Sequence, residues 1–161
     1  MIRQLKVEEF DKFLDLAVVH HIDAGLPEND QIDRGYSKKQ LRNMYIYQNW
    51  RIYVAEEGNK TIGYIAGYAD KKLWNNTLFG EIVLLFVHPD YRSKTVADQL
   101  FDSMVDWFTS IGCEYYLASC MSWNNDYAKV DAWSDRATKY FKSRNMNEVG
   151  YTYIQPIDRG F

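Results

Sequence analysis

A long apolar run that stops at a proline constrains the fold of this chain more than any other feature. Residues 79–87 are apolar at positions that would face both sides of a sheet, which is typical of a central strand. His88 and Pro89 end the run, and apolar side chains then recur on one face of a helix. These helix positions are Val96, Leu100, Met104, Trp107, Phe108 and Ile111. A buried strand followed by an amphipathic helix predicts a mixed α/β layer.

The remaining periodicities extend this pattern over one domain, residues 1–161. Residues 23–36 are the least patterned stretch and predict a long loop. The capping-box pattern Ser37-Lys38-Lys39-Gln40 predicts the start of the second helix. The other predicted elements are strand 2–6, helix 10–22, strands 50–54 and 62–68, strand 113–120, helix 134–144 and strand 148–154. The order β-α-α-β-β-β-α-β-α-β predicts a mixed central sheet with helices on both faces.

Composition excludes several functional classes. The 22 acidic and 19 basic residues give a net charge of −3, which lacks the basic footprint of a nucleic-acid binder. Cys113 and Cys120 are the two cysteines, too few for a disulfide framework or a metal cluster, so we expect a reducing compartment. The N-terminus has no apolar signal core, and no apolar run approaches membrane-spanning length. We therefore expect a cytoplasmic protein without a membrane partner.

The turn after the central strand has the form of an anion-binding device. After strand 79–87 the chain runs through residues 88–92 to a short turn, residues 93–95, from which the amphipathic helix begins. The unpaired N–H groups and the positive end of the helix dipole both point toward such a turn. The sequence therefore predicts that an anion binds here.

The same segment resembles motif A of the GNAT superfamily of N-acetyltransferases. The family's strand ends V-x-P-x-Y-R, and residues 87–92 read Val-His-Pro-Asp-Tyr-Arg. The family's turn then follows the pattern Q/R-x-x-G-x-G/A, which Arg92 and Ala97 keep. Thr95 replaces the middle glycine, and Ser93 replaces another glycine common there. The order of predicted elements is similar to that fold across nearly the whole chain.

The resemblance implies that the protein transfers an acetyl group from acetyl-CoA to a primary amine of a small molecule or a protein, without a metal. The pantetheine arm of the coenzyme would pair with the strand backbone. The coenzyme-binding residues implied are Leu85, Phe86 and Val87 for the arm, and Arg92, Ser93, Lys94, Thr95, Val96 and Ala97 for the pyrophosphate. Whether the protein forms a homodimer is left open.

Glu81 interrupts the apolar strand and is a candidate general base. It shares strand parity with Val83, Leu85 and Val87. A carboxylate in such surroundings is poorly solvated and holds a proton more readily, which suits a base near neutral pH. In several GNAT enzymes a glutamate at the matching place takes this role. The alternative is a strand-end glutamate that reaches solvent or pairs with a lysine.

Helix 134–144 resembles the motif B helix of the family and contains a candidate acid, Tyr140. When the two are aligned on Ala137, the family's tyrosine, which often protonates the leaving thiolate, falls on Phe141. An offset of one residue turns a helical side chain by about 100°. Tyr140 is therefore either the acid or, like Phe141, a residue that packs in the core. Ser134 and Asn145 also depart from the motif.

Other reactive side chains favour structural interpretations. Asp98, Asp102 and Asp106 recur every four residues, which is typical of a solvated helix face rather than a metal site. His20 and His21 lack a third ligand at metal spacing, and Cys120 lacks a neighbouring base, which indicates a packed thiol. The connection 121–127 is either a substrate lid or a surface loop.

The competing hypothesis is a GNAT-fold binding or structural module that has lost turnover, of cellular or phage origin. The motif departures at Ser93, Thr95, Ser134, Phe141 and Asn145 favour it. A nucleotide-binding module is disfavoured because the sequence contains neither G-x-G-x-x-G nor a P-loop.

Overall fold

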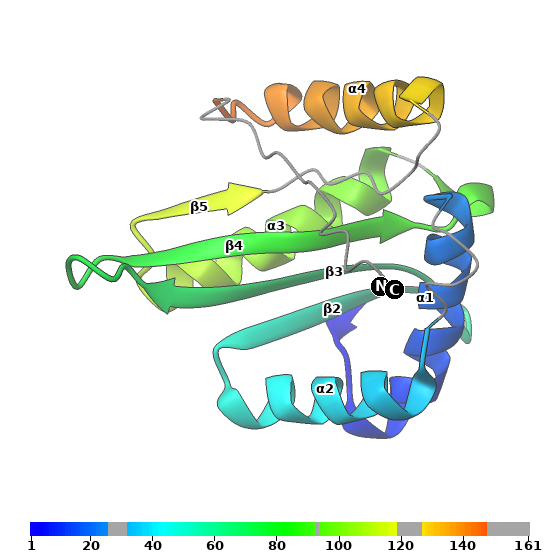
Figure 1. Ribbon diagram of the computed structural model, residues 1–161, viewed down its shortest axis with the longest axis horizontal. Coiled ribbons are helices and arrows are strands. Elements are labelled where there is room, and N and C mark those ends of the chain that lie inside the picture. The colour runs from blue at the N-terminus through cyan, green and yellow to red at the C-terminus, as the bar shows by residue number, and fades with distance from the viewer. Residues whose placement is uncertain (26–31, 93, 119–126, 148–161) are drawn as a thin grey trace, which may run out of the picture.

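The computed structural model describes residues 1–25, 32–92, 94–118 and 127–147, with side chains omitted at 94 and 127–134. In these residues five strands form one sheet in the order β1-β2-β3-β4-β5 (Figure 1). The strands are β1 Ile2–Gln4, β2 Trp50–Glu57, β3 Lys60–Lys71, β4 Leu78–Val87 and β5 Tyr115–Ala118. Neighbouring strands are antiparallel except for β4 and β5, which are parallel.

The described residues also form four α-helices and two 3₁₀ helices. They are η1 Val7–Glu9, α1 Phe10–Asp23, α2 Arg34–Tyr47, η3 Pro89–Tyr91, α3 Lys94–Ser110 and α4 Tyr127–Ser143. The predicted mixed α/β order is confirmed from β1 through α4, and the strand predicted at 148–154 lies outside the described residues. No helix in the described ranges is both long enough and apolar enough to cross a membrane.

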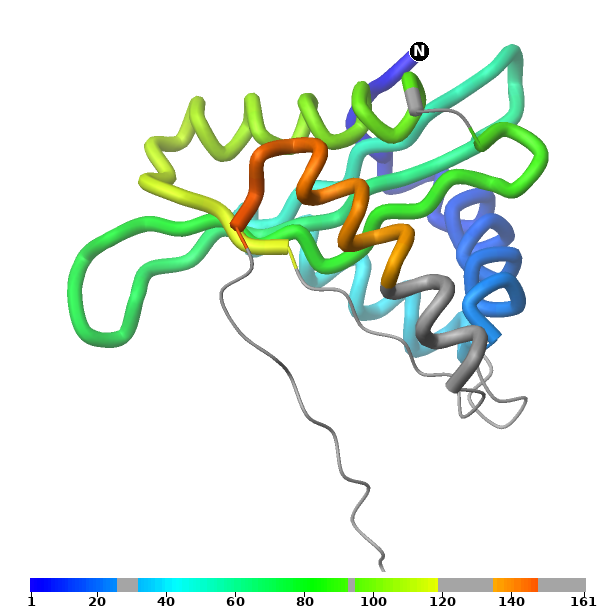
Figure 2. Tube along the Cα trace, turned by 90° about the horizontal axis from the view of Figure 1, so that it is seen from above, coloured from blue at the N-terminus to red at the C-terminus, as the bar shows by residue number. Residues whose placement is uncertain are grey.

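Helices cover both faces of the sheet, as predicted. Helix α3 packs on one face, and α1 and α2 pack on the other (Figure 2). Alternating side chains of the strands supply both cores, so that Ile65 faces α3 while its neighbour Tyr64 faces α1. The α3-side core contains Ile65, Ile82, Leu100, Phe101, Met104 and Phe108. The core under α1 and α2 contains Phe13, Leu14, Leu41, Val54, Tyr64 and Phe86.

Two predicted helix starts are wrong. Helix α2 begins at Arg34, inside the predicted loop 23–36 and ahead of the predicted capping box at Ser37. The carboxylate of Asp33 caps it and accepts a hydrogen bond from the Tyr36 N–H at 2.9 Å. Helix α4 begins at Tyr127, well before the predicted start at Ser134. Asp33 can cap a helix through its side-chain oxygen as Ser37 can, and it lies earlier in the chain. The capping-box pattern alone therefore placed the start of α2 too late.

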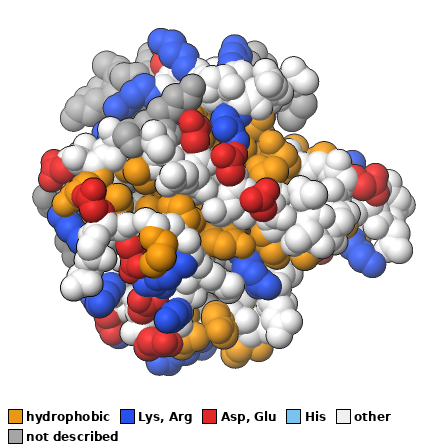
Figure 3. Space-filling model, turned by 180° about the vertical axis from the view of Figure 1, so that it is seen from behind, with side chains coloured by type: hydrophobic (Ala, Val, Ile, Leu, Met, Phe, Trp, Pro, Cys, Tyr) orange, Lys and Arg blue, Asp and Glu red, His pale blue; other side chains and the backbone are white. Residues whose placement is uncertain are grey.

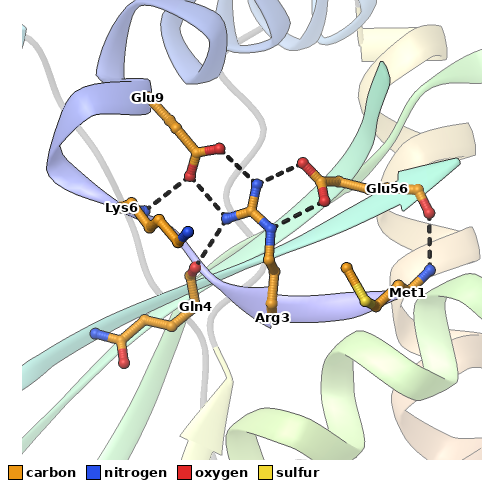
Figure 4. Close-up of polar contacts among 6 residues, drawn as sticks. All are labelled: Met1, Arg3, Gln4, Lys6, Glu9 and Glu56. Carbon is orange, nitrogen blue, oxygen red and sulfur yellow. Dashed lines mark hydrogen bonds and ion pairs between the residues drawn. The ribbon is translucent and has the colours of Figure 1, made fainter. Parts of the chain in front are cut away.

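An arginine network ties the short strand β1 to its neighbours (Figure 4). The guanidinium of Arg3 donates to Glu56 on β2, with Nε at 2.9 Å from one carboxylate oxygen. It also donates to Glu9 of η1, at 2.7 and 2.6 Å. The hydrogen bond from Arg3 lowers the pKa of Glu9, because it favours the ionised carboxylate. The network thus links β1 to both β2 and η1.

The β3–β4 hairpin projects beyond the rest of the sheet (Figure 3). Leu73 and Trp74 near its tip are 84% and 86% exposed. At its base, Lys72 lies over the ring of Tyr115 at 4.8 Å, which links the hairpin to β5.

Candidate functional site

Strands β4 and β5 stay paired over only part of their length. Their register runs from Phe79 opposite Tyr115 to Ile82 opposite Ala118. Beyond Ile82, β4 continues to Val87, and Figure 1 shows it running past the end of β5. In the part of the chain that the structure describes, only β3 pairs with this last segment. Among the described strands, the backbone edge that the predicted pantetheine contact at Leu85, Phe86 and Val87 requires is therefore open toward β5.

A β-bulge at Val83 changes which side chains share a face. Leu84 pairs with Ala66 and Ile82 pairs with Gly67, so Val83 has no partner in β3. Before the bulge, Gly80 faces α3, because a Cβ there would lie 2.6 Å from the Phe108 ring. After it, Leu85 and Val87 pack toward α3.

The shared parity predicted for Glu81 with Leu85 and Val87 is therefore wrong. Glu81 lies on the opposite face, the one that holds Leu84 and Phe86, because its cross-strand partner Tyr68 lies there. Strict alternation assumes that every residue of β4 has one partner, and the extra residue in the bulge reverses the alternation beyond it.

Glu81 is half-buried and accepts a hydrogen bond from a tyrosine. The phenolic O–H of Tyr68, directly opposite on β3, donates to Oε2 of Glu81. The ring of Tyr68 in turn packs 4.9 Å from the ring of Trp50 on β2. Burial, and then the hydrogen bond to Glu81, raise the pKa of Tyr68 to about 12. The phenol therefore remains protonated and can donate at neutral pH.

Leu84 marks the accessible part of this face. Although it lies in an interior strand, it is 42% exposed, and it sits between Glu81 and Phe86 on the same side of the sheet. Beyond it, α1 closes the face, because the ring of His20 stacks on Phe86 at 4.4 Å. Nδ1 of His20 lies 2.5 Å from the hydroxyl of Tyr64. A ligand can therefore reach β4 between Glu81 and Phe86.

The ring of His20 packs against the core residues Phe86 and Tyr64. Burial lowers its pKa to about 4, so the ring is neutral at pH 7. Among the described residues, no group of three or more histidine, cysteine or acidic side chains could hold a metal ion.

The turn after β4 is anchored through Arg92. Its Nε donates to the carbonyl of Val87 at 3.3 Å, and its Nη2 donates to the carboxylate of Asp23 at the end of α1. Ser93 lies outside the described residues, and only the backbone of Lys94, the first residue of α3, is described. Of the other predicted phosphate residues, Thr95 is exposed, whereas Val96 and Ala97 are half-buried against the α3-side core.

The structure does not bring Tyr140 to Glu81. Tyr140 packs edge-on against Phe101 of α3, with ring centroids 5.9 Å apart, and belongs to the α3-side core. Burial raises the pKa of Tyr140, and neighbouring Asp98 raises it further. Phe141 contacts Phe101 as well, at 6.3 Å. The two candidate catalytic side chains therefore face opposite sides of the sheet.

The acidic stripe on α3 differs from the prediction. Arg144, at the end of α4, pairs with both Asp98, at 3.6 Å, and Asp102. Asp102 and Asp106 are exposed, as predicted, whereas Asp98 is half-buried. The stripe helps to join α3 to α4, which no spacing within α3 could indicate.

Some predictions fall on residues that are not described. Cys120 and residues 121–126 of the connection are outside the described ranges, although Tyr127 begins α4. Cys113 is a half-buried free thiol, and burial raises its pKa.

Sequence reasoning missed three residues of the site: Tyr68, Leu84 and Asp23. The alternation in strand 62–68 places Tyr68 on a face, but its pairing with Glu81 depends on the hairpin register. Asp23 is the last residue of α1, and nothing in the neighbouring sequence indicates that its carboxylate pairs with Arg92.

Similar solved structures show the same fold. An aminoglycoside acetyltransferase, meta-AAC0020, from an uncultured soil metagenomic sample superposes with a TM-score of 0.74 at 18% identity, covering 98% of this chain and 96% of that one. A ribosomal-protein-alanine N-acetyltransferase from Brucella melitensis biovar Abortus 2308 has a TM-score of 0.69 at 14% identity, covering 98% and 99%. A possible acetyltransferase from Clostridium difficile 630 has a TM-score of 0.72 at 16% identity, covering 98% and 96%.

Sequence comparison adds the family. No curated protein matches the chain. The family model described as the acetyltransferase (GNAT) family matches residues 19–144, which include the end of α1, the open segment of β4 and the Arg92 turn. Because that match spans most of the sequence and agrees with the fold, this chain belongs to the GNAT acetyltransferase family.

Proposed function

We propose that this protein is an N-acetyltransferase that transfers the acetyl group of acetyl-CoA to a primary amine. The observation that carries the proposal is the open edge of β4 from Val83 to Val87, which leads directly to Arg92 and the start of α3. A pantetheine arm can add to such an edge through backbone hydrogen bonds. The pyrophosphate would then lie against the N–H groups at the start of α3.

The side chains above this edge suit the acceptor. An amine that approaches over the exposed Leu84 would meet the Glu81 carboxylate on the same face. An alkylammonium has no lone pair, so a proton must first pass from its nitrogen to Glu81. The nitrogen then bonds to the thioester carbon, and the oxyanion is steadied by backbone N–H groups of β4. The C–S bond breaks, and a second proton from the nitrogen neutralises the leaving thiolate.

The acceptor class is an amine of a small molecule or a protein. Two of the similar structures bear names with different acceptors, an aminoglycoside and a ribosomal-protein alanine. A binding module without turnover is the second candidate. It is favoured by Thr95, whose side chain stands where the family turn has glycine, and by the pairing of Arg92 with Asp23.

Two measurements test the proposal. Calorimetric titration with acetyl-CoA and, separately, with coenzyme A should give saturable binding of both. A panel of aminoglycosides, polyamines and peptides with free N-termini should then produce free thiol from acetyl-CoA. The proposed function is wrong if neither coenzyme binds. Binding without thiol release for any amine would favour the module.

A further inference from the structure

We propose that Tyr68 is the positioning residue of the Glu81 carboxylate, an inference that rests on the proposed function of Glu81 as the base. Tyr68 lies directly opposite Glu81 in the β3–β4 register, and its hydroxyl donates to Oε2 of that carboxylate. Tyr68 would not touch the reacting atoms. It would act by holding the Glu81 carboxylate in one orientation.

A row of side chains across three strands fixes the direction of the tyrosine. Trp50 on β2 pairs with Tyr68 on β3, which pairs with Glu81 on β4. The Trp50 and Tyr68 rings lie 4.9 Å apart at an angle of 37°, and both side chains are half-buried. A tyrosine has only two side-chain torsions, so packing of its ring also determines where its O–H points.

The bulge places this pair at the edge of the accessible segment. The Tyr68–Glu81 pair lies before Val83, so the hairpin register holds it independently of the bulge. The extra residue then brings Leu84, rather than Val83 or Leu85, onto the same face. The hydrogen bond therefore holds a carboxylate beside the one segment of β4 that is exposed on this face.

The chemistry of the bond suits a positioning role. A phenol that donates to one carboxylate oxygen fixes the orientation of the whole carboxylate group. Because burial raises the pKa of Tyr68 to about 12, the phenol supplies its proton to this bond throughout the neutral range. Hydrogen bonds to a charged partner are the stronger ones.

The first test measures turnover of Tyr68→Phe, which keeps the ring and removes the donor. We expect kcat to fall about tenfold, while KM for acetyl-CoA stays within about twofold. Tyr53→Phe is the matched control, because it removes a hydroxyl from a half-buried tyrosine that packs toward α3. Its kcat should equal that of the wild type.

A double variant shows whether Tyr68 acts through Glu81. In a Glu81→Gln background, Tyr68→Phe should cause no further loss of turnover, because the carboxylate it positions is absent. The inference would be overturned if Tyr68→Phe lowered kcat by the same factor in the Glu81→Gln background as in the wild type. It would also be overturned if Tyr68→Phe changed KM alone.

The second test does not depend on activity. The Glu81 carboxyl carbon is observed by NMR at pH 7 in the wild type, in Tyr68→Phe and in Tyr53→Phe. Loss of the donor should change the chemical shift of this carbon in Tyr68→Phe alone, because its carboxylate accepts the hydrogen bond from Tyr68. An unchanged resonance in Tyr68→Phe overturns the inference, whereas a wild type that acetylates no amine while Tyr68→Phe shows the change overturns only the proposed function.

Discussion

The guanidinium of Arg92 donates to the carboxylate of Asp23, which joins the predicted phosphate turn to the last residue of α1. A second N–H of Arg92 donates to the Val87 carbonyl, where β4 ends. The arginine is thus held between strand, turn and helix. The carboxylate of Asp23 thus pairs with the guanidinium that the proposed function assigns to the pyrophosphate.

This pairing predicts opposite effects for its two partners. Arg92→Gln should weaken coenzyme A binding by about tenfold, because a charged hydrogen bond to phosphate is lost. Asp23→Asn should tighten binding, because it removes a negative charge that competes for the guanidinium. Calorimetric titration measures both. If both variants bind like the wild type, Arg92 is not a phosphate residue.

Glu81→Gln should separate catalysis from coenzyme binding. Gln keeps the size of the side chain but cannot accept the proton of the amine. Turnover should fall by about 10²–10⁴-fold, while affinity for acetyl-CoA stays the same. The loss should shrink at high pH, where more of the amine is already deprotonated. Glu57→Gln, at an exposed strand end, is the control, and an equal loss there would contradict the assignment.

The start of α3 should respond to charge rather than to size. Ala97→Asp places a carboxylate near the proposed pyrophosphate and should weaken coenzyme A binding by roughly tenfold or more. Ala97→Ser is the neutral control and should bind normally. Thr95→Gly should keep or improve the affinity, because it lets the phosphate approach the backbone more closely. Equal affinity in Ala97→Asp and the wild type would remove this site.

Gly80 leaves no room for a side chain beneath Phe108. An added Cβ would lie 2.6 Å from three atoms of a ring that is 1% exposed. Gly80→Ala should therefore lower the free energy of unfolding by about 1–3 kcal/mol, as overpacking does. Urea denaturation measures the loss, and Phe108→Leu in the same chain should restore part of it. A Gly80→Ala protein as stable as the wild type would contradict the packing described.

His20 should make stability fall in mild acid. Burial holds the pKa of His20 at about 4, below its ordinary value of 6.5. The unfolded chain therefore binds a proton at His20 more readily than the folded chain does. The contribution of His20 to the free energy of unfolding is complete above about pH 6.5 and is lost as pH falls toward 4. The loss should reach about 3 kcal/mol. His20→Gln should flatten this part of the curve in denaturation measured at several pH values, and an unchanged slope would contradict it.

Local patterns determined much of this protein. The apolar run 79–87 and the helix after it lie in one continuous segment, so hydrophobic periodicity located β4 and α3 from neighbouring residues alone. The turn at Arg92 lies in the same continuous segment, and the anion site predicted there at the start of α3 stays a prediction. The motif at 87–92 then led to the GNAT family, which the family match shows.

Only the tertiary structure decided the arrangement around Glu81. Its partner Tyr68, the bulge at Val83 and the face on which Leu84 lies all depend on how β3 and β4 pair. The links from Arg92 to Asp23 and from Arg144 to Asp98 join helices and turns that are far apart in the chain. Periodicity reports which side of an element is buried, whereas register, bulges and ion pairs between elements arise only when separate segments pack together.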